Sequence, residues 1–466
     1  MKRVINFLFF ILLAGALFAE GKAKYVFFFI GDGMGMNQVN GTEMYLAEKA
    51  GYIGTQSLLF TQFPVTGIST TFSLRNSVTD SAAAGTALAT GSKTINGTLG
   101  LDGEGNRLTS VAEKAKKAGR KVGITTSVSV DHATPAAFYA HQSGRNMAYE
   151  ISLNLIEAGF DFYAGAGFVR PDKTYDNQSA PNVFGLFQSA GYTVAKGYND
   201  FKSKSSKASK IILIQEDGKA VDALPYAIDQ KVDDLTLAQI TESAIASLSK
   251  NASKGFFLMV EGGKIDWACH GNDGATVFNE VIDMDNAIKV AYEFYNKHPK
   301  ETLIVITADH ETGGIYLGTG GSELNLKAFQ NQQCSQDVLS NRIKDLRKSK
   351  SQVSWEDIKT LLGETMGFWK ELPITWAQEK KLRDTYEESF SKAGNARMER
   401  SMYSESEPLA ARAKEVINEI ALIGWGSRGH SAGYVPVFAI GADAQLFIGK
   451  MDNTDIPKRI AKAAGY

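Results

Sequence analysis

The stretch YVFFFIGDG, Tyr25–Gly33, decides the fold class of this 466-residue chain. Its apolar run, Tyr25–Ile30, is typical of a strand that is buried on both faces, as in a parallel sheet. Asp32 follows the run after a single glycine. In open parallel sheets, ligands bind beyond the carboxyl ends of the strands, which is where this carboxylate would lie. The stretch therefore predicts a parallel sheet with a polar site at one edge.

Further apolar runs downstream have the same character. Helical patterns at residues 108–118, 235–249 and 279–295 lie between them. Strand and helix alternating in this way predict an α/β fold with a doubly wound, mainly parallel central sheet flanked by helices. The further runs are Val122–Val130, Lys210–Ile214, Phe256–Val260 and Leu303–Thr307.

Most of these runs end at side chains that can bind a ligand. Because the carboxyl ends of parallel strands meet at one edge of the sheet, we expect these side chains to form a single site. They are Asp32, Asp131 with His132, Glu261, and Asp309 with His310.

The amino-acid composition excludes several classes of protein. Lys and Arg together number 50 against 51 Asp and Glu, so no basic field is available to recruit nucleic acid. With 44% hydrophobic and 22% charged residues, the chain has the mix of an ordinary soluble globular protein. Cys269 and Cys334 are the only cysteines, which excludes a disulfide scaffold and leaves open whether the two pair.

The chain is expected to divide into three parts. Residues 1–19 combine two basic residues, an apolar run and a final alanine, which predicts a secretory signal peptide and a periplasmic or secreted protein. An uncleaved anchor is the alternative, but the run is shorter than the ~20 residues that a spanning helix needs, so no stable membrane span is expected after cleavage. Residues 20–317 and 424–466 form the predicted α/β core, and residues 318–423 a mostly helical insertion.

Two pairs of side chains suit a metal. Asp266 and His270, in IDWACH, project from one face of a helix and fit zinc, although a helix-surface hydrogen bond is the alternative. The same helical spacing leaves Cys269 open as a ligand. Asp309 and His310 lie where a strand gives way to a loop, so that both can reach one ion; a strand-end cap is the alternative.

Ser81 and Arg145 suit a phosphate group. Ser81 follows a helix cap at Thr79 or Asp80, at the positive end of the helix dipole. No histidine lies close in sequence to act as its base, but zinc could lower the pKa of its hydroxyl. Arg145 follows a predicted helix at 135–142 and could clamp a phosphate with two hydrogen bonds. Taken alone, the serine is more often a helix start and the arginine a surface residue.

Six motifs together resemble those of the alkaline phosphatases. They occur in that family's order and span almost the whole mature core. The motifs are FIGDGMG (29–35), VTDSAAAGTALATGSKTING (78–97), HATPAAFYAH (132–141) ahead of Arg145, MVEGGKIDWACH (259–270), TADHETGG (307–314) and GHSAG (429–433).

The resemblance implies two zinc ions, one magnesium ion and a homodimer. Ser81 would be the nucleophile that forms a covalent phosphoserine, and Arg145 would grip the phosphate oxygens. A metal at each side of the phosphoryl group would stabilise the attacking and leaving oxygens. The implied ligands are Asp266, His270 and His430 for the first zinc, Asp32, Asp309 and His310 for the second, and Asp32, Thr134 and Glu261 for magnesium.

Two positions depart from one branch of the family. His132 stands where some members have an acid beside the magnesium site, which leaves magnesium occupancy open. Trp267 stands where they have a lysine near the phosphate. With Asp266, His270 and His430 as the protein ligands of the first zinc, Cys269 is expected to be a packed bystander. The segment between His310 and His430 is long for the family.

The sequence therefore predicts an exported alkaline phosphatase that hydrolyses phosphate monoesters. A relative that acts on phosphodiesters or sulfate esters is the nearest alternative. Ser81 is followed by alanines rather than by a sulfatase motif. A diesterase usually lacks the third metal site, whereas this chain has both Thr134 and Glu261 for it. A secreted phosphate-binding or metal-binding protein without turnover is the alternative from another class.

Overall fold

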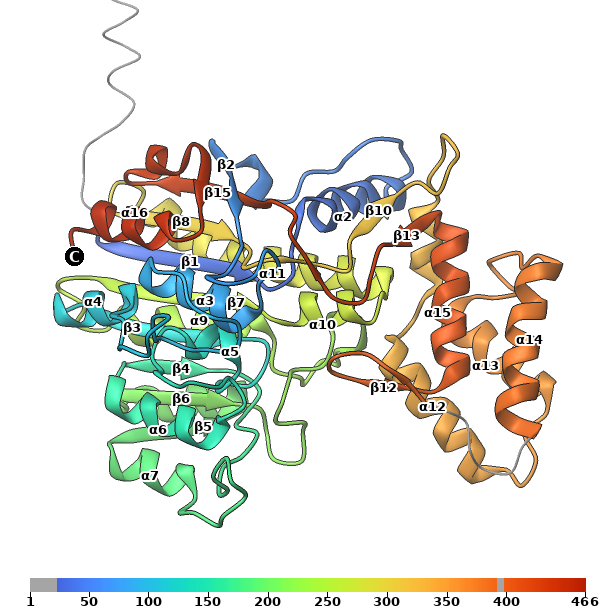
Figure 1. Cartoon of the computed structure of the whole chain (residues 1–466), viewed down its shortest axis with the longest axis horizontal. Coiled ribbons are helices and arrows are strands. Elements are labelled where there is room, and N and C mark those ends of the chain that lie inside the picture. The colour runs from blue at the N-terminus through green and yellow to red at the C-terminus, as the bar shows by residue number, and fades with distance from the viewer. Residues whose placement is uncertain (1–22, 392–397) are drawn as a thin grey trace, which may run out of the picture.

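A ten-stranded sheet forms the centre of the molecule (Figure 1). The computed structural model describes residues 23–391 and 398–466, so the predicted signal peptide, residues 1–19, lies outside the described residues. In spatial order the strands are β16 (Gly449–Asp452), β2 (Val65–Thr70), β15 (Val435–Gly441), β8 (Thr302–Thr307), β1 (Tyr25–Gly31), β7 (Phe256–Gly262), β3 (Lys121–Thr126), β4 (Phe162–Ala164), β6 (Lys210–Ile214) and β5 (Tyr192–Lys196).

The sheet is mainly parallel, which confirms the predicted fold class. Strand β1 pairs in parallel with both β7 and β8, and β3 continues the parallel order beyond β7. Strand β15 alone runs antiparallel to its neighbours, β2 and β8. Strands β2, β4, β5 and β16 were not predicted, since β4 has only three residues and the other three are partly exposed and have no continuous apolar run.

Helices cover both faces of the sheet, as a doubly wound fold requires. In β1, Phe27 and Phe29 point to one face, and Val26 and Phe28 point to the other. The first face packs against α2 (Met36–Lys49), α8 (Tyr198–Lys204), α9 (Leu237–Leu248) and α11 (Gly274–Lys297). The second packs against α3 (Ser81–Thr90), α4 (Val111–Lys117), α6 (Ala148–Ala158), α7 (Val183–Ser189) and α16 (Asp455–Ala464).

Two predicted elements differ from the structure. The strand predicted over 122–130 ends at Thr126, because the Thr126 hydroxyl accepts a hydrogen bond from Val128 N–H and turns the backbone away from the sheet. The helix predicted over 135–142 is only the single turn α5 (Ala133–Ala136), because Gln142 forms a backbone bridge with Leu99 instead of continuing the helix.

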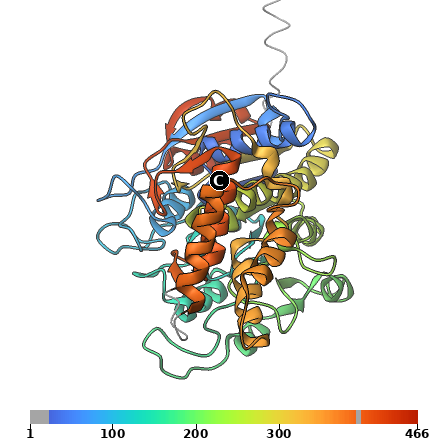
Figure 2. The ribbon, with the colours of Figure 1, turned by 90° about the vertical axis from the view of Figure 1, so that its right-hand side faces the viewer.

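The described residues between 318 and 423 form mainly a group of helices beside the sheet (Figure 1). Strand β10 (Ile315–Leu317) pairs with β13 (Ile423–Trp425), so the chain leaves the core and returns to it side by side. Figure 2 views the molecule from this side and shows the helices in the foreground. They are α12 (Gln336–Ser349), α13 (Trp355–Met366), α14 (Trp376–Ser391) and α15 (Pro408–Ala421).

Two further features bear on the predictions. Cys269 and Cys334 are both buried and both free, so the two do not pair. None of the helices in the described ranges has the length and apolar character that crossing a membrane requires.

Candidate active site

Three neighbouring strands bring acidic side chains to one edge of the sheet. Asp32 follows β1, Glu261 lies in β7, and Asp309 follows β8. Because β1 lies between β7 and β8, the three carboxylates arrive next to one another. Gly33 makes the turn after β1 with φ of +73°, and a Cβ there would lie 2.9 Å from the Cα of Asp266. Glycine is therefore required where the backbone passes the site.

A first group of side chains able to hold a cation consists of Asp32, Asp309 and His310. Their ligand atoms lie within 4.8 Å of one another, and all three side chains are fully buried. His310 Nε2 lies 3.3 Å from Asp309 Oδ2 and 3.5 Å from Asp32 Oδ1. The Asp309 Oδ1 atom accepts hydrogen bonds from the backbone N–H groups of Gly33 and His310, which fixes the carboxylate.

A second group gathers around Asp266. Asp266 and His270 lie on α10 (Lys264–His270), and His430 lies on β14 (His430–Ser431), which pairs with β9 (Glu311–Thr312) directly after His310. His270 Nε2 lies 3.3 Å from Asp266 Oδ2 and 3.2 Å from His430 Nε2. Asp266 and His430 also form a ligand group with His310, so the first two groups adjoin.

The three histidines of these groups are held by their outer nitrogens. His270 Nδ1 lies 2.5 Å from the carbonyl oxygen of Arg428, and His430 Nδ1 lies 2.8 Å from that of Thr79. His310 Nδ1 lies 3.2 Å from the hydroxyl of Thr312. A carbonyl can only accept, so Nδ1 of His270 and of His430 carries the proton, and in the neutral ring Nε2 presents a lone pair to the carboxylates.

A third group consists of Asp32, His132 and Glu261. His132 Nδ1 lies 3.9 Å from Glu261 Oε1, and the Thr134 hydroxyl donates to Asp32 Oδ2 at 3.4 Å. The second oxygen of Glu261 accepts from the Thr126 hydroxyl. Sequence reasoning placed His132 beside this site. The structure places it within ligand reach, together with the expected Thr134.

Several buried carboxylates lie close to one another at this edge. Burial, followed by the nearby charge of Asp309, raises the pKa of Asp32, and burial raises the pKa of Glu261 to about 7. Burial and the charge of Arg145 lower the pKa of His132 to about 3. At this edge, the buried atoms without a hydrogen-bond partner among the described residues include Asp32 Oδ1, Asp266 Oδ2, Asp309 Oδ2, Glu261 Oε1 and His132 Nδ1.

These atoms fit bound cations. Buried polar atoms are ordinarily paired, and buried charges are paired or coordinate metals. Carboxylates with imidazole suit zinc, and oxygen-rich groups suit magnesium. By contrast, Cys269 belongs to none of the three groups found in the described residues. Its thiol accepts a weak hydrogen bond from Gln38 at 3.7 Å, and burial raises its pKa.

Ser81 is the first residue of α3. Asp80 is its N-cap, and its side chain accepts a hydrogen bond from Ala83 N–H at 3.0 Å. The cap therefore forms at Asp80 rather than at Thr79. It orients Ser81 so that its Oγ lies 3.2 Å from His310 Nε2. The nucleophile candidate is thus within hydrogen-bond reach of a ligand candidate that lies 229 positions further along the sequence.

Arg145 lies at the side of the site that solvent reaches. Its side chain is 23% exposed, whereas those of Asp32, Asp309 and His310 are fully buried. Nη1 donates to Asp80 Oδ2 at 3.2 Å, and Nη2 donates to the Tyr403 hydroxyl at 3.3 Å. Nη2 also lies 3.4 Å from His132 Nε2.

Sequence reasoning missed Tyr403. Its ring stacks on Trp267, with the centroids 4.4 Å apart and the planes 9° from parallel. No sequence signal could have found this residue, because it lies 258 positions from Arg145 in an irregular, polar part of the helical segment.

Comparisons with known proteins agree with this geometry. The family model described as alkaline phosphatase matches residues 23–159 and 173–466. Alkaline phosphatase 3 of Bacillus subtilis is 31% identical over 455 residues, covering 96% of this chain and 90% of that protein.

Solved structures of similar proteins have the same fold. The structure of a cold-active alkaline phosphatase from Shewanella sp. is 28% identical, covers 94% of this chain and 99% of its own, and has a TM-score of 0.79. The alkaline phosphatase of the Antarctic bacterium TAB5, as a histidine-to-aspartate mutant with Mg bound in its M3 site, is 27% identical, covers 96% and 99%, and has a TM-score of 0.67. This chain belongs to the alkaline phosphatase family, whose enzymes are phosphoric monoester hydrolases.

Proposed function

We propose that this enzyme is exported and hydrolyses phosphate monoesters through a covalent phosphoserine at Ser81, with two zinc ions and one magnesium ion. The observation that carries the proposal is the position of Ser81 Oγ, at the N-terminus of α3 and 3.2 Å from His310 Nε2. His310 belongs to two of the three adjoining ligand groups, and the third shares Asp32 with one of them. The basic and apolar pattern of residues 1–19 supports export.

Each proposed ion has its own set of side chains. When bound, the cations would supply Lewis-acid chemistry, lowering the pKa of a hydroxyl or a water and neutralising charge on the phosphoryl oxygens. Asp266, His270 and His430 would hold the first zinc, Asp32, Asp309 and His310 the second, and Asp32, Glu261 and Thr134, with His132 beside them, the magnesium.

The reaction follows from the positions of Ser81 and Arg145. Ser81 Oγ gives up its proton and bonds to the phosphorus, the bond from phosphorus to the ester oxygen breaks, and that oxygen takes a proton as the alcohol leaves. Water then gives up a proton and bonds to the phosphorus of the phosphoserine, the bond from Ser81 Oγ to phosphorus breaks, Oγ takes a proton, and inorganic phosphate is released. The Arg145 guanidinium orients the phosphoryl oxygens through charged hydrogen bonds. The α3 dipole favours the negative charge that accumulates at its N-terminus.

The helical segment is part of this proposal. We assign residues 20–317 and 424–466 to the catalytic core and residues 318–423 to an insertion. The pairing of β10 with β13 supports this division, because it brings the two connections to the segment together.

The test is an assay of the purified protein on p-nitrophenyl phosphate and on its bis-ester at alkaline pH, with and without a chelator. Ser81→Ala removes the proposed nucleophile, and Ser77→Ala, in the exposed loop ahead of α3, is the matched control. We expect the wild type and Ser77→Ala to hydrolyse the monoester in preference to the diester. Activity should be lost on chelation and in Ser81→Ala.

The other outcomes identify the alternatives. Preference for the diester would favour a diesterase. An inactive wild type that still binds zinc and phosphate would favour a binding protein without turnover. Monoester hydrolysis that survives chelation or the Ser81→Ala substitution would contradict the mechanism.

A further inference from the structure

Tyr403 brings the helical segment into the active site. Its hydroxyl accepts a hydrogen bond from Arg145 Nη2 at 3.3 Å. Its ring stacks on Trp267 and meets the His270 ring edge-on, with the centroids 5.4 Å apart. A side chain from residues 318–423 therefore contacts three residues of the core at the site.

A short hairpin holds Tyr403 there. Strands β11 (Glu399–Arg400) and β12 (Glu405–Ser406) pair antiparallel, and Tyr403 lies in the turn between them. Ser401 N–H donates to the carbonyl oxygen of Ser404 at 2.9 Å, which closes this turn.

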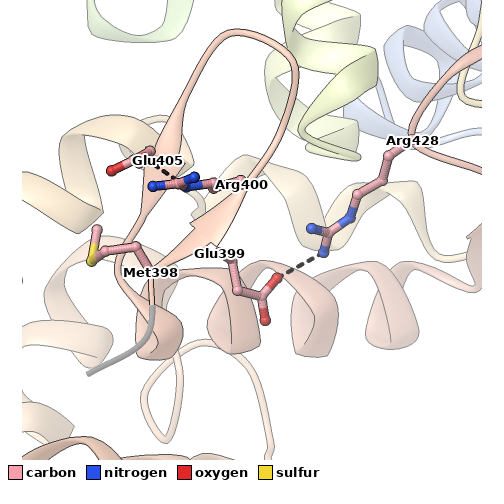
Figure 3. Close-up of a pocket in the computed structure, with 5 residues that line it drawn as sticks. All are labelled: Met398, Glu399, Arg400, Glu405 and Arg428. Atoms are coloured by element: carbon pink, nitrogen blue, oxygen red, sulfur yellow. Dashed lines mark hydrogen bonds and ion pairs between the residues drawn. The ribbon is translucent and has the colours of Figure 1, made fainter. Parts of the chain in front are cut away.

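Both sides of the hairpin are tied to the rest of the molecule. On the β12 side, the amide of Gln336 on α12 donates to the Ser406 hydroxyl, and Glu407 N–H donates to Ser340 Oγ at 2.8 Å. On the β11 side, Glu399 forms an ion pair of 2.8 Å with Arg428. This pair lines a pocket of about 610 Å³ on the hairpin (Figure 3). The Arg428 carbonyl in turn contacts His270 Nδ1, so the hairpin is anchored next to the proposed ligands.

The guanidinium of Arg145 is held at two of its nitrogens. Asp80 accepts from Nη1 and Tyr403 accepts from Nη2, so the two acceptors fix the plane of the group. A long, partly exposed arginine has many rotamers. The conformational entropy that it loses when it binds a phosphate weakens the binding. The two fixed acceptors reduce this entropy loss, because they already orient the planar guanidinium before the phosphate binds.

We propose that Tyr403 is a positioning residue that orients Arg145 for phosphate, so that the segment 318–423 completes the phosphate-binding side of the site within the same chain. This inference rests on the proposed function, in which Arg145 binds the phosphoryl oxygens. Because the hydrogen bond acts on the clamp and not on Ser81, its loss should weaken the binding of substrate and phosphate more than it slows the chemical step.

The test uses Tyr403→Phe, which keeps the ring on Trp267 and removes only the hydroxyl. Tyr52→Phe, at an exposed tyrosine in the loop after α2, is the matched control. Because the lost hydrogen bond orients Arg145 and does not itself contact phosphate, we expect KM for p-nitrophenyl phosphate and Ki for inorganic phosphate to rise about three- to tenfold, the effect of an ordinary hydrogen bond. We expect kcat to change less than twofold, and Tyr52→Phe to match the wild type.

The same substitution in an Arg145→Ala background shows whether Tyr403 acts through Arg145. We expect Tyr403→Phe to change Ki less than twofold there, because the group that it positions is gone. An equal effect in both backgrounds, or no effect in the wild-type background, would overturn the inference and leave the proposed function standing. A wild type that neither hydrolyses the ester nor binds phosphate would overturn both.

A second pair of variants tests the hairpin itself. Glu399→Gln breaks the ion pair with Arg428, and Glu405→Gln breaks the more exposed pair with Arg400, both shown in Figure 3. We expect Glu399→Gln to raise Ki for phosphate about two- to threefold, the range of a partly exposed ion pair. Glu405→Gln should leave Ki unchanged, and equal effects of the two would contradict the anchoring role of β11.

Discussion

The Ser81 hydroxyl lies 3.2 Å from Nε2 of His310, although 229 positions separate the two residues. Burial, followed by the charge of His430, lowers the pKa of His310 well below its ordinary value, so its ring is neutral and can accept from the hydroxyl. The same Nε2 atom faces the carboxylates of Asp32 and Asp309. The nucleophile candidate and one proposed cation site therefore share a single nitrogen.

Bound metal should stabilise the fold. Asp32, Asp309 and Glu261 are fully buried, and burial together with nearby negative charge raises the pKa of each, so the metal-free protein carries repulsion and desolvation that a cation would relieve. Zinc at a hundred times its Kd adds about 2.7 kcal/mol, which should raise Tm by roughly 3 °C in a chain of this length. Differential scanning calorimetry with chelator and then with zinc measures the shift. Without metal, Asp309→Asn should have a higher Tm than the wild type, and zinc should raise its Tm much less. A lower Tm than the wild type without metal would contradict this account.

Asp80 should affect both stability and phosphate binding. It caps α3 and also accepts from Arg145 Nη1 at 3.2 Å. Asp80→Ala should cost about 1 kcal/mol of unfolding free energy, the usual value of a cap, and should raise KM for the monoester. Asp80→Asn keeps an acceptor for the cap and should raise KM with little loss of stability. If Asp80→Asn left KM unchanged, the carboxylate would have no part in holding Arg145.

His132 should determine how tightly the third group, Asp32, His132 and Glu261, binds magnesium. It supplies a nitrogen beside Glu261 and Asp32, whereas magnesium prefers oxygen ligands. We expect His132→Asp to lower the magnesium concentration for half-maximal activity about tenfold or more, the range that changes around a metal site produce. Zinc titration of the same variant is the control and should be unaffected. An unchanged magnesium requirement would show that His132 does not contribute to this site.

Asp131 should make the stability of the protein depend on pH. Burial raises its pKa from 3.8 to about 7, and one of its oxygens has no hydrogen-bond partner among the described residues. Because the folded state holds this proton more tightly than the unfolded state, the group lowers stability progressively as pH rises from about 4 to 7. Asp131→Asn should remove that loss, which is at most about 4 kcal/mol.

Urea unfolding of both proteins in chelator, at pH 5 and pH 8, measures this effect. The advantage of Asp131→Asn over the wild type should be larger at pH 8. An advantage that is equal at the two pH values would mean that Asp131 is already ionised in the folded protein at pH 5.

The long apolar runs were sufficient to predict the centre of the sheet. Tyr25–Ile30, Phe256–Val260 and Leu303–Thr307 became three adjacent strands, and the polar residues at their ends meet as expected. The outer strands β2 and β5 have partly exposed, mixed sequences whose pairing depends on their neighbours. Such context is not visible in a single sequence.

Local spacing could not place residues that come together through tertiary structure. The resemblance placed His430 at the site, whereas nothing in the sequence indicated Tyr403, which reaches Trp267 only because α12 and Arg428 anchor its hairpin. The predicted helix at 135–142 was wrong for the same kind of reason. Its alanines favour a helix, but Gln142 pairs with Leu99 in a backbone bridge, which holds the end of the segment in a non-helical conformation.

The most direct test of the central claim is to trap the covalent intermediate. The metal-loaded enzyme is mixed with p-nitrophenyl phosphate, quenched rapidly in acid and digested, and the peptides are measured by mass spectrometry. We predict one added phosphoryl group on Ser81 in the wild type and none in Ser81→Ala, which should also be inactive. Steady turnover in Ser81→Ala, or a phosphoryl group found only on another residue, would contradict the account.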